Sequence, residues 1–337
     1  MNKNYGQFGY GVQTAKGTAA SAPTVSYYAS ADSDGMDSAK NLETINLTIG
    51  GKSTAVDTYT SEVDVTMSTT TLGFADVLGM MLYGAMGDDE VTKDGTVYTH
   101  TITAGESLPY ITAFEQKGST SAALRKMTDA KVNGVTMNAE GTAPIAFTYE
   151  LVGCDAPWTA TTAWSGPAFD IDNGYYTLAG AQVLFSLSTD TPGDVPAGVN
   201  LESLEISIAN NAAATRVLGN PKPADQVEAT QQIGVSITGT TDSTALYREV
   251  ITGSAAGTDI ATSVVTGSLQ MTFAHSAESD YSFVVQVPKI PWTCAVPAVS
   301  TDGGPFELSL STDDALADNG TAATFIVTNG SSLNYGN

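Results

Sequence analysis

The sequence predicts a mainly β protein with two tandem antiparallel β-sandwich or barrel domains and one flanking helix. Three observations lead to this fold class. Alternating apolar and polar residues recur along most of the chain, which is the period of half-buried strands. Only one segment has helical spacing. The length of 337 residues suffices for two domains of ordinary size.

The first strong strand signals lie between residues 42 and 69. Residues 42–49 lead into a glycine turn at 50–51, after which Val65 and Met67 alternate with polar neighbours. This pattern predicts strands with one buried face.

The helical pattern covers about residues 72–86. Apolar residues recur at i, i+3, i+4 and i+7 from Phe74 to Ala85, with Thr71 as the N-cap candidate and Gly87 as the stop. An amphipathic helix of this size covers one face of a sheet, so we expect it to flank the first domain.

Further strand-like runs fill both halves of the chain on either side of a predicted linker. Pro157, Pro167 and several Thr and Gly residues indicate the linker at 157–177. We therefore predict a first β domain at 42–156 and a second at 178–337. An internal repeat is compatible with two registers, which set residues 134–137 on 234–237 or residues 147–159 on 281–293.

Residues 1–41 are predicted to form an extended N-terminal arm. They are rich in Gly, Ala, Ser and Thr and lack a periodic apolar pattern, yet they carry several aromatic residues. We expect Phe8, Tyr10, Tyr27 and Tyr28 to be assembly contacts that become ordered against a neighbouring subunit.

The charge balance is strongly acidic, with 36 Asp and Glu against 13 Lys and Arg and a formal net charge of −23. Affinity for nucleic acid comes mainly from Lys and Arg, so this composition argues against a domain that grips DNA. It is compatible with a surface that DNA slides past.

The sequence gives no sign of secretion, membrane insertion or catalysis. The opening residues lack an apolar signal segment, and the longest apolar stretch, 77–86, is too short to span a bilayer. We expect Cys154 and Cys294 to be free thiols. His100 and His275 stand in strand-like settings without a nucleophile motif, and the acidic clusters lack the ligands of a calcium loop. We predict no catalytic residue, cofactor or metal site.

The order of features resembles the tail tube proteins of siphophages, the long-tailed bacteriophages with non-contractile tails. The resemblance rests on the Gly-rich opening at 6–20, the strand 61–69 running into the helix, and the runs at 98–102, 108–112 and 126–153. It covers residues 1–155 well and the remainder only in style.

The resemblance implies two packed antiparallel sheets flanked by a helix. In this family, sheets of neighbouring subunits join into a barrel around a lumen, and rings stack to conduct the genome. The implied partners are copies of the chain and the tape measure, tail tip and tail terminator proteins. Viral DNA passes without specific binding. The implied location is the virion tail, assembled in the host bacterial cytoplasm.

Chain length and the repeat favour a trimeric ring with pseudo-sixfold symmetry over a hexamer. The alternative is a hexamer whose second domain is an Ig-like decoration. Glu62 and Asp64 are the candidates for acidic residues that face the lumen, and the 1–41 arm is expected to bridge successive rings. The rival function is an extracellular tandem-β adhesin or surface-layer protein, since the domains are rich in Thr.

Overall fold

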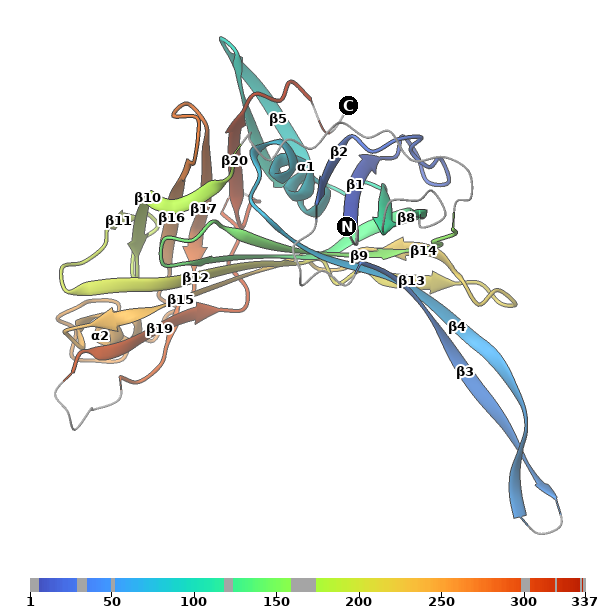
Figure 1. Cartoon of the computed structure of the whole chain (residues 1–337). Coiled ribbons are helices and arrows are strands. Elements are labelled where there is room, and N and C mark those ends of the chain that lie inside the picture. The colour runs from blue at the N-terminus through green and yellow to red at the C-terminus, as the bar shows by residue number, and fades with distance from the viewer. Residues whose placement is uncertain are drawn as a thin grey trace.

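The computed structural model describes residues 6–28, 35–49, 52–117, 124–158, 174–297, 304–318, 320–333 and 335. Two antiparallel sheets share one buried core with the helix α1 (Ala75–Met86) (Figure 1). The mainly β fold with a flanking helix is therefore confirmed. Most of the predicted linker, residues 159–173, lies outside the described residues.

The large sheet has eleven strands, and its main path runs β18-β19-β15-β12-β8-β7-β1-β2. Strand β9 pairs with β8, β4 pairs with β9, and β3 pairs with β4. The strands are β1 (Gly6–Val12), β2 (Val25–Tyr28), β3 (Gly35–Ile49), β4 (Lys52–Leu72), β7 (Ile111–Lys117), β8 (Leu124–Glu140), β9 (Ala146–Gly153), β12 (Val199–Ala209), β15 (Gln232–Thr241), β18 (Thr293–Cys294) and β19 (Phe306–Thr312).

The small sheet has seven strands in the order β11-β10-β16-β17-β20-β6-β5. They are β5 (Gly87–Asp94), β6 (Val97–Ala104), β10 (Tyr176–Ser186), β11 (Gly193–Asp194), β16 (Gly267–His275), β17 (Ser282–Ile290) and β20 (Thr324–Asn329). A separate hairpin pairs β13 (Ala213–Arg216) with β14 (Pro223–Val227). Each sheet contains strands from both halves of the chain. The halves meet at the β8–β12 pair in the large sheet and at the β6–β20 pair in the small sheet.

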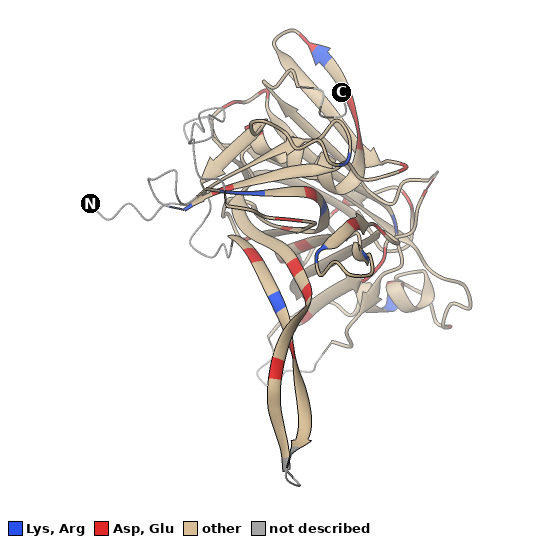
Figure 2. Cartoon of the chain, turned by 90° about the vertical axis from the view of Figure 1, so that its right-hand side faces the viewer, with Lys and Arg blue, Asp and Glu red and all other residues tan. Residues whose placement is uncertain are grey.

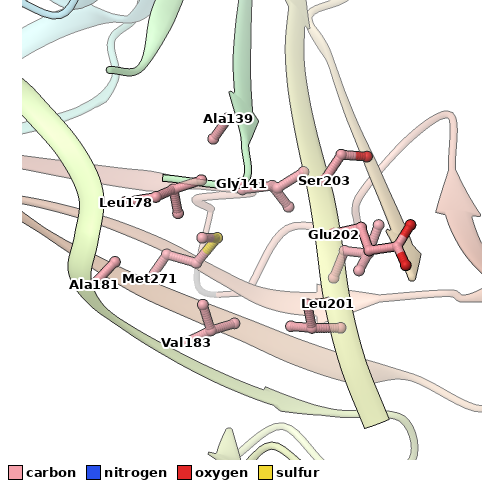
Figure 3. Close-up of a pocket in the computed structure, with 11 residues that line it drawn as sticks. Ala139, Gly141, Leu178, Ala181, Val183, Leu201, Glu202, Ser203 and Met271 are labelled. Carbon is pink, nitrogen blue, oxygen red and sulfur yellow. The ribbon is translucent and has the colours of Figure 1, made fainter. Parts of the chain in front are cut away.

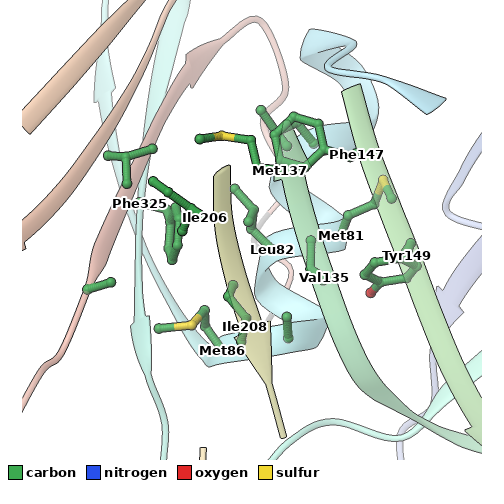
Figure 4. Packing of buried hydrophobic residues seen from close by; sticks show 14 of the residues in the cluster. Met81, Leu82, Met86, Val135, Met137, Phe147, Tyr149, Ile206, Ile208 and Phe325 are labelled. Carbon is green, nitrogen blue, oxygen red and sulfur yellow. The ribbon is translucent and has the colours of Figure 1, made fainter. Parts of the chain in front are cut away.

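Helix α1 is buried almost all round because it packs against both sheets. All its residues except Asp76 are buried. Figure 4 shows Met81 and Leu82 against side chains of the large sheet, including Phe147 and Tyr149 of β9. Deleting such contacts in a close-packed core leaves cavities, so this layer contributes strongly to stability.

The helix begins three residues later than the sequence pattern indicates. Thr71, the expected N-cap, belongs to β4, and Phe74 occupies the N-cap position without a side-chain hydrogen bond. The predicted stop is correct. Gly87 adopts φ 96°, a left-handed conformation that glycine accepts without steric penalty.

A second helix, α2 (Ala245–Thr252), lies where the sequence suggested one of the strand-like runs of the second half. Only Leu246 and Val250 are buried, at the i, i+4 spacing of one helix face. Over six residues this spacing is difficult to distinguish from a short apolar strand, which explains the error.

The predicted extended arm is wrong for the residues that the structure describes. Residues 6–12 and 25–28 are β1 and β2, and β1 pairs with β7 through seven residue pairs. Residues 35–41 begin β3. Glycines and hydroxyl residues obscured the strands, whose pairing partners come from elsewhere in the chain.

Both proposed repeat registers are also wrong. The first sets residues 151–153 of β9 on residues 251–253 of α2, which matches a strand to a helix. The second sets β9 of the large sheet on β17 of the small sheet. Alternating patterns match easily because every half-buried strand shares them.

Candidate functional site: the open sheet face and the projecting hairpin

One face of the large sheet packs on the core, and the other is polar. Along β4, β9, β8, β12, β15 and β19, buried apolar residues alternate with residues that are half-buried or exposed. The side chains of this second set define the open face: Thr66, Ser68, Thr70, Thr148, Glu150, Val152, Thr136, Asn138, Glu140, Ser203, Glu205, Ser207, Ser236, Thr238, Thr240, Glu307, Ser309 and Ser311.

Short hydroxyl side chains form continuous rows across the open face. The pairing registers set Thr70 beside Thr148, Thr148 beside Thr136, and Thr136 beside Ser207. The hydroxyls of Thr70 and Thr148 lie 3.2 Å apart, within hydrogen-bond distance. Cross-strand hydroxyl pairs of this kind stabilise a sheet without apolar burial.

The charge on the open face has one sign. Its carboxylates are Glu140, Glu150, Glu205 and Glu307, and all four side chains are exposed. Among the side chains assigned to this face, none is Lys or Arg. The open face is therefore an acidic surface that is rich in short hydroxyl side chains.

Strands β3 and β4 continue beyond the body as a long projecting hairpin (Figure 1). Acidic and basic residues are spaced along it, as Figure 2 shows. Several large apolar side chains are exposed along it: Leu42, Ile45, Leu47, Val56 and Tyr59. Leu42 is 63% exposed and Leu47 is 53% exposed. Clustered apolar exposure of this kind marks an interaction surface.

Two buried charged residues fix the base of the hairpin on the β3 side. The Glu115 carboxylate accepts a hydrogen bond from the Met36 N–H at 2.9 Å, and the Arg125 guanidinium donates to the Met36 carbonyl. Lys117 lies 3.1 Å from the Glu115 carboxylate, and Arg125 lies over the ring of Trp158. Both backbone groups of Met36 are thus held by side chains of the body.

Glu62 and Asp64, the predicted lumen residues, lie at the base of the hairpin on the β4 side. Arg216 of β13 pairs with both carboxylates, at 3.5 Å from Glu62 and in a shorter contact with Asp64. One guanidinium therefore offsets part of their charge within the chain. The carboxylates of the open face were not singled out from the sequence, although their strand parity was a readable signal.

Three of the four predicted assembly aromatics are core residues. Phe8, Tyr10 and Tyr27 are buried, and Tyr28 is exposed. The hydroxyls of Tyr10 and Tyr27 lie 2.7 Å apart, and that of Tyr27 lies 2.6 Å from the Thr69 hydroxyl. Burial raises the pKa of Tyr27 to about 12. A role between subunits for Phe8, Tyr10 and Tyr27 is corrected, because their own chain covers them.

Both histidines make hydrogen bonds within the folded chain. His100 is fully buried, with Nδ1 3.1 Å from the Asp89 carboxylate and Nε2 donating to the Ser331 carbonyl at 3.1 Å. His275 Nδ1 accepts the backbone N–H of Glu278 at 2.9 Å, which closes a turn. Neither histidine neighbours a Ser or Cys nucleophile arrangement in these contacts.

No group of three or more His, Cys, Asp or Glu side chains suited to a metal occurs among the described residues. Cys154 and Cys294 are free thiols, and burial raises the pKa of Cys154 to about 11. A thiol with a raised pKa is a poor nucleophile at neutral pH. Within the described part of the chain, no helix is long and apolar enough to cross a membrane.

A cavity of about 130 Å³ opens between the two sheets (Figure 3). Its walls are mainly apolar, with Leu178, Val183, Leu201 and Met271 pointing inward and Glu202 at the rim. Its polar side chains are Glu202 and Ser203, and among the described residues its lining includes no histidine, cysteine or lysine.

Comparison with known protein families finds no matching family model, and a search of curated proteins finds no match.

Proposed function

We propose that this chain is the structural subunit of a bacteriophage tail tube, which polymerises as stacked rings around an acidic lumen that conducts viral DNA. The observation that carries the proposal is the open face of the large sheet. It combines hydroxyl rows with the carboxylates of Glu140, Glu150, Glu205 and Glu307 and has no cationic side chain.

Such a surface suits a channel wall for DNA. Proteins hold DNA mainly by pairing Lys and Arg with phosphates, and the open face supplies neither. Carboxylates repel the phosphate backbone, which keeps the duplex centred and mobile.

The projecting hairpin supports assembly from many copies. In an isolated chain, Leu42 and Leu47 expose apolar surface to water, and contact with another subunit removes that cost. In the proposed tube, the hairpin takes the role of bridging rings that the sequence assigned to the arm. The trimer with pseudo-sixfold symmetry remains the preferred ring, with tape measure, tip and terminator proteins as partners in the virion.

Negative-stain electron microscopy of the purified protein tests the assembly. Hollow tubes or rings are expected, and their number should rise with protein concentration. Discrete monomers at every concentration would overturn the proposal and favour the tandem-β adhesin.

The acidic lumen is tested separately by charge reversal. A variant with Glu140→Lys, Glu150→Lys, Glu205→Lys and Glu307→Lys should assemble into tubes that retain DNA, with retention falling steeply as salt rises. The matched control reverses Glu90, Glu106, Glu202 and Glu278, which lie outside the open face. Equal DNA retention by both variants would contradict an acidic lumen on this face.

A further inference from the structure

The strand order of the large sheet contains a repeat. Without β1, β2 and β7, the sheet reads β3-β4-β9-β8 and then β12-β15-β19-β18. In each set, the second strand leads within four residues into a helix, α1 or α2, and the next hairpin, β5/β6 or β16/β17, belongs to the small sheet. Each half thus builds the same four-stranded unit.

The repeat is visible in the sequence once the strands are matched. Val65 of β4 corresponds to Val235 of β15, and Ala75 of α1 corresponds to Ala245 of α2, at the same offset. This register sets buried Met67 on buried Ile237, so the core-facing parity is the same in both halves. The two registers predicted from the sequence have offsets that differ from this structural one.

One junction joins the two units within the chain. Residues 134–140 of β8 pair with residues 203–209 of β12, and this pairing buries Val135 opposite Ile208. The strands equivalent to β8 and β12 are β18 and β3, which end the eight-strand run at opposite sides. The large sheet therefore carries, at its two ends, the two strands that a second junction of this kind requires.

We propose that β18 and its continuation through residue 297 pair with β3 of a second copy, as β8 pairs with β12 inside one copy. This inference rests on the proposed function and names the strands that join subunits. The equivalent of Val135 on β18 is Val296, and the equivalent of Ile208 on β3 is Lys40. Both equivalences follow from the pairing registers of the two units. The proposed contact therefore places Val296 opposite Lys40.

The backbone of β3 is oriented for this contact. Met36 gives both backbone groups to Glu115 and Arg125, on the side away from β4. Because strand residues alternate in hydrogen-bond direction, Lys40 also directs its N–H and C=O away from β4. The side chains of Glu115 and Arg125 occupy the edge at Met36, so the available edge begins beyond that residue.

The edge at β18 has the matching orientation. The Ala295 N–H donates to the Ser309 carbonyl at 3.1 Å, so the neighbouring Val296 directs its backbone groups away from β19. Val296 is 72% exposed, whereas its equivalent, Val135, is buried at the internal junction. Pro297 directs its backbone to the same side as Ala295, toward β19. Its missing N–H therefore removes no donor from the outer edge.

The resulting contact is head-to-tail. One copy contributes β18 and the next contributes β3, so each copy has one unused edge of each kind until a ring closes. Ring closure removes both edges, which otherwise template unwanted pairing.

Disulfide trapping in assembled particles tests the junction. Asn41→Cys and Ala295→Cys are combined with Cys294→Ser. The predicted register makes positions 41 and 295 a non-hydrogen-bonded pair, with Cα atoms about 4.5 Å apart, within the range that disulfides span. Mild oxidation should give covalent oligomers on a non-reducing gel, whereas either single cysteine should give none.

Two further variants complete the test. Thr136→Cys with Ser207→Cys, in the same Cys294→Ser background, should form an intrachain disulfide at the internal junction and shows that the chemistry works. Val296→Pro removes an N–H that faces the outer edge, so it should abolish rings while leaving the melting temperature of the monomer unchanged. Val296→Ala is its matched control and should assemble.

The outcomes distinguish the two proposals. Rings or tubes that form without cross-links between positions 41 and 295, or that tolerate Val296→Pro, overturn the β18–β3 junction and leave the proposed function standing. A wild-type protein that forms neither rings nor tubes overturns both. Covalent oligomers together with loss of rings in Val296→Pro support the junction.

Discussion

The two faces of the large sheet use alternate residues of the same strands for opposite purposes. On β9, Phe147 and Tyr149 are buried against α1, whereas Thr148 and Glu150 lie on the open face. We expect the buried face to dominate stability and the open face to contribute little to it. Alternate side chains of one strand therefore have different roles: one set forms the core, and the other forms the wall of the proposed channel.

The largest effect is expected on the buried face. Phe147→Ala removes a ring that packs against Phe283 and α1, and should lower the free energy of unfolding by about 3–5 kcal/mol. Urea denaturation followed by tryptophan fluorescence measures it. A loss below about 1 kcal/mol would show that the buried face is loosely packed.

The buried tyrosines extend the comparison to pH. Burial raises the pKa of Tyr27 to about 12 from 10.0, so the contribution of its neutral phenol is complete below pH 10. That contribution, about 2.7 kcal/mol for a shift of about two units, is lost as the pH rises through 12. Urea denaturation at rising pH should show the loss, and Tyr27→Phe should reduce it. An unchanged pH profile in Tyr27→Phe would contradict this origin.

A matched pair of glutamates sharpens the boundary between the faces. Glu115→Ala leaves the buried Met36 N–H without its acceptor and should cost about 1–3 kcal/mol. Glu150→Ala, on the open face, should change stability by less than about 0.5 kcal/mol. Thermal unfolding of both variants checks the difference, and equal losses would place Glu150 in a structural role.

The smallest effect is expected for the hydroxyl rows. Thr148→Ala removes one hydroxyl contact with Thr70 and should alter the free energy of unfolding by no more than about 0.5 kcal/mol. The same urea titration used for Phe147→Ala measures it. A loss approaching that of the neighbouring phenylalanine would show that the open face is covered in the folded chain.

Local patterns predicted much of the secondary structure because alternation and helical spacing depend on neighbouring residues. They identified the strand around Val65 and Met67 and the stop at Gly87. They could not predict that β1 pairs with β7 or that β8 pairs with β12, since these contacts join residues far apart in sequence. Local patterns alone therefore could not assign the aromatic residues of β1 and β2 to a core.

The sequence led to carboxylates on a strand face as the candidate site, but it could not show how those carboxylates are paired. The acidic composition indicated carboxylates on a strand face, and Glu62 and Asp64 were the candidates because they lie on the polar side of a strand beside the predicted helix. Arg216, 152 residues after Asp64, pairs with both carboxylates, and no local pattern reveals that contact. Assigning the open face required the pairing registers of six strands.

The position of β20 has a consequence for synthesis. Residues 324–329 lie between β6 and β17, in the interior of the small sheet rather than at its edge. Strand β6 must therefore wait for more than two hundred further residues to leave the ribosome before it gains this neighbour. A nascent or prematurely terminated chain therefore lacks the strand that joins the two halves within the small sheet.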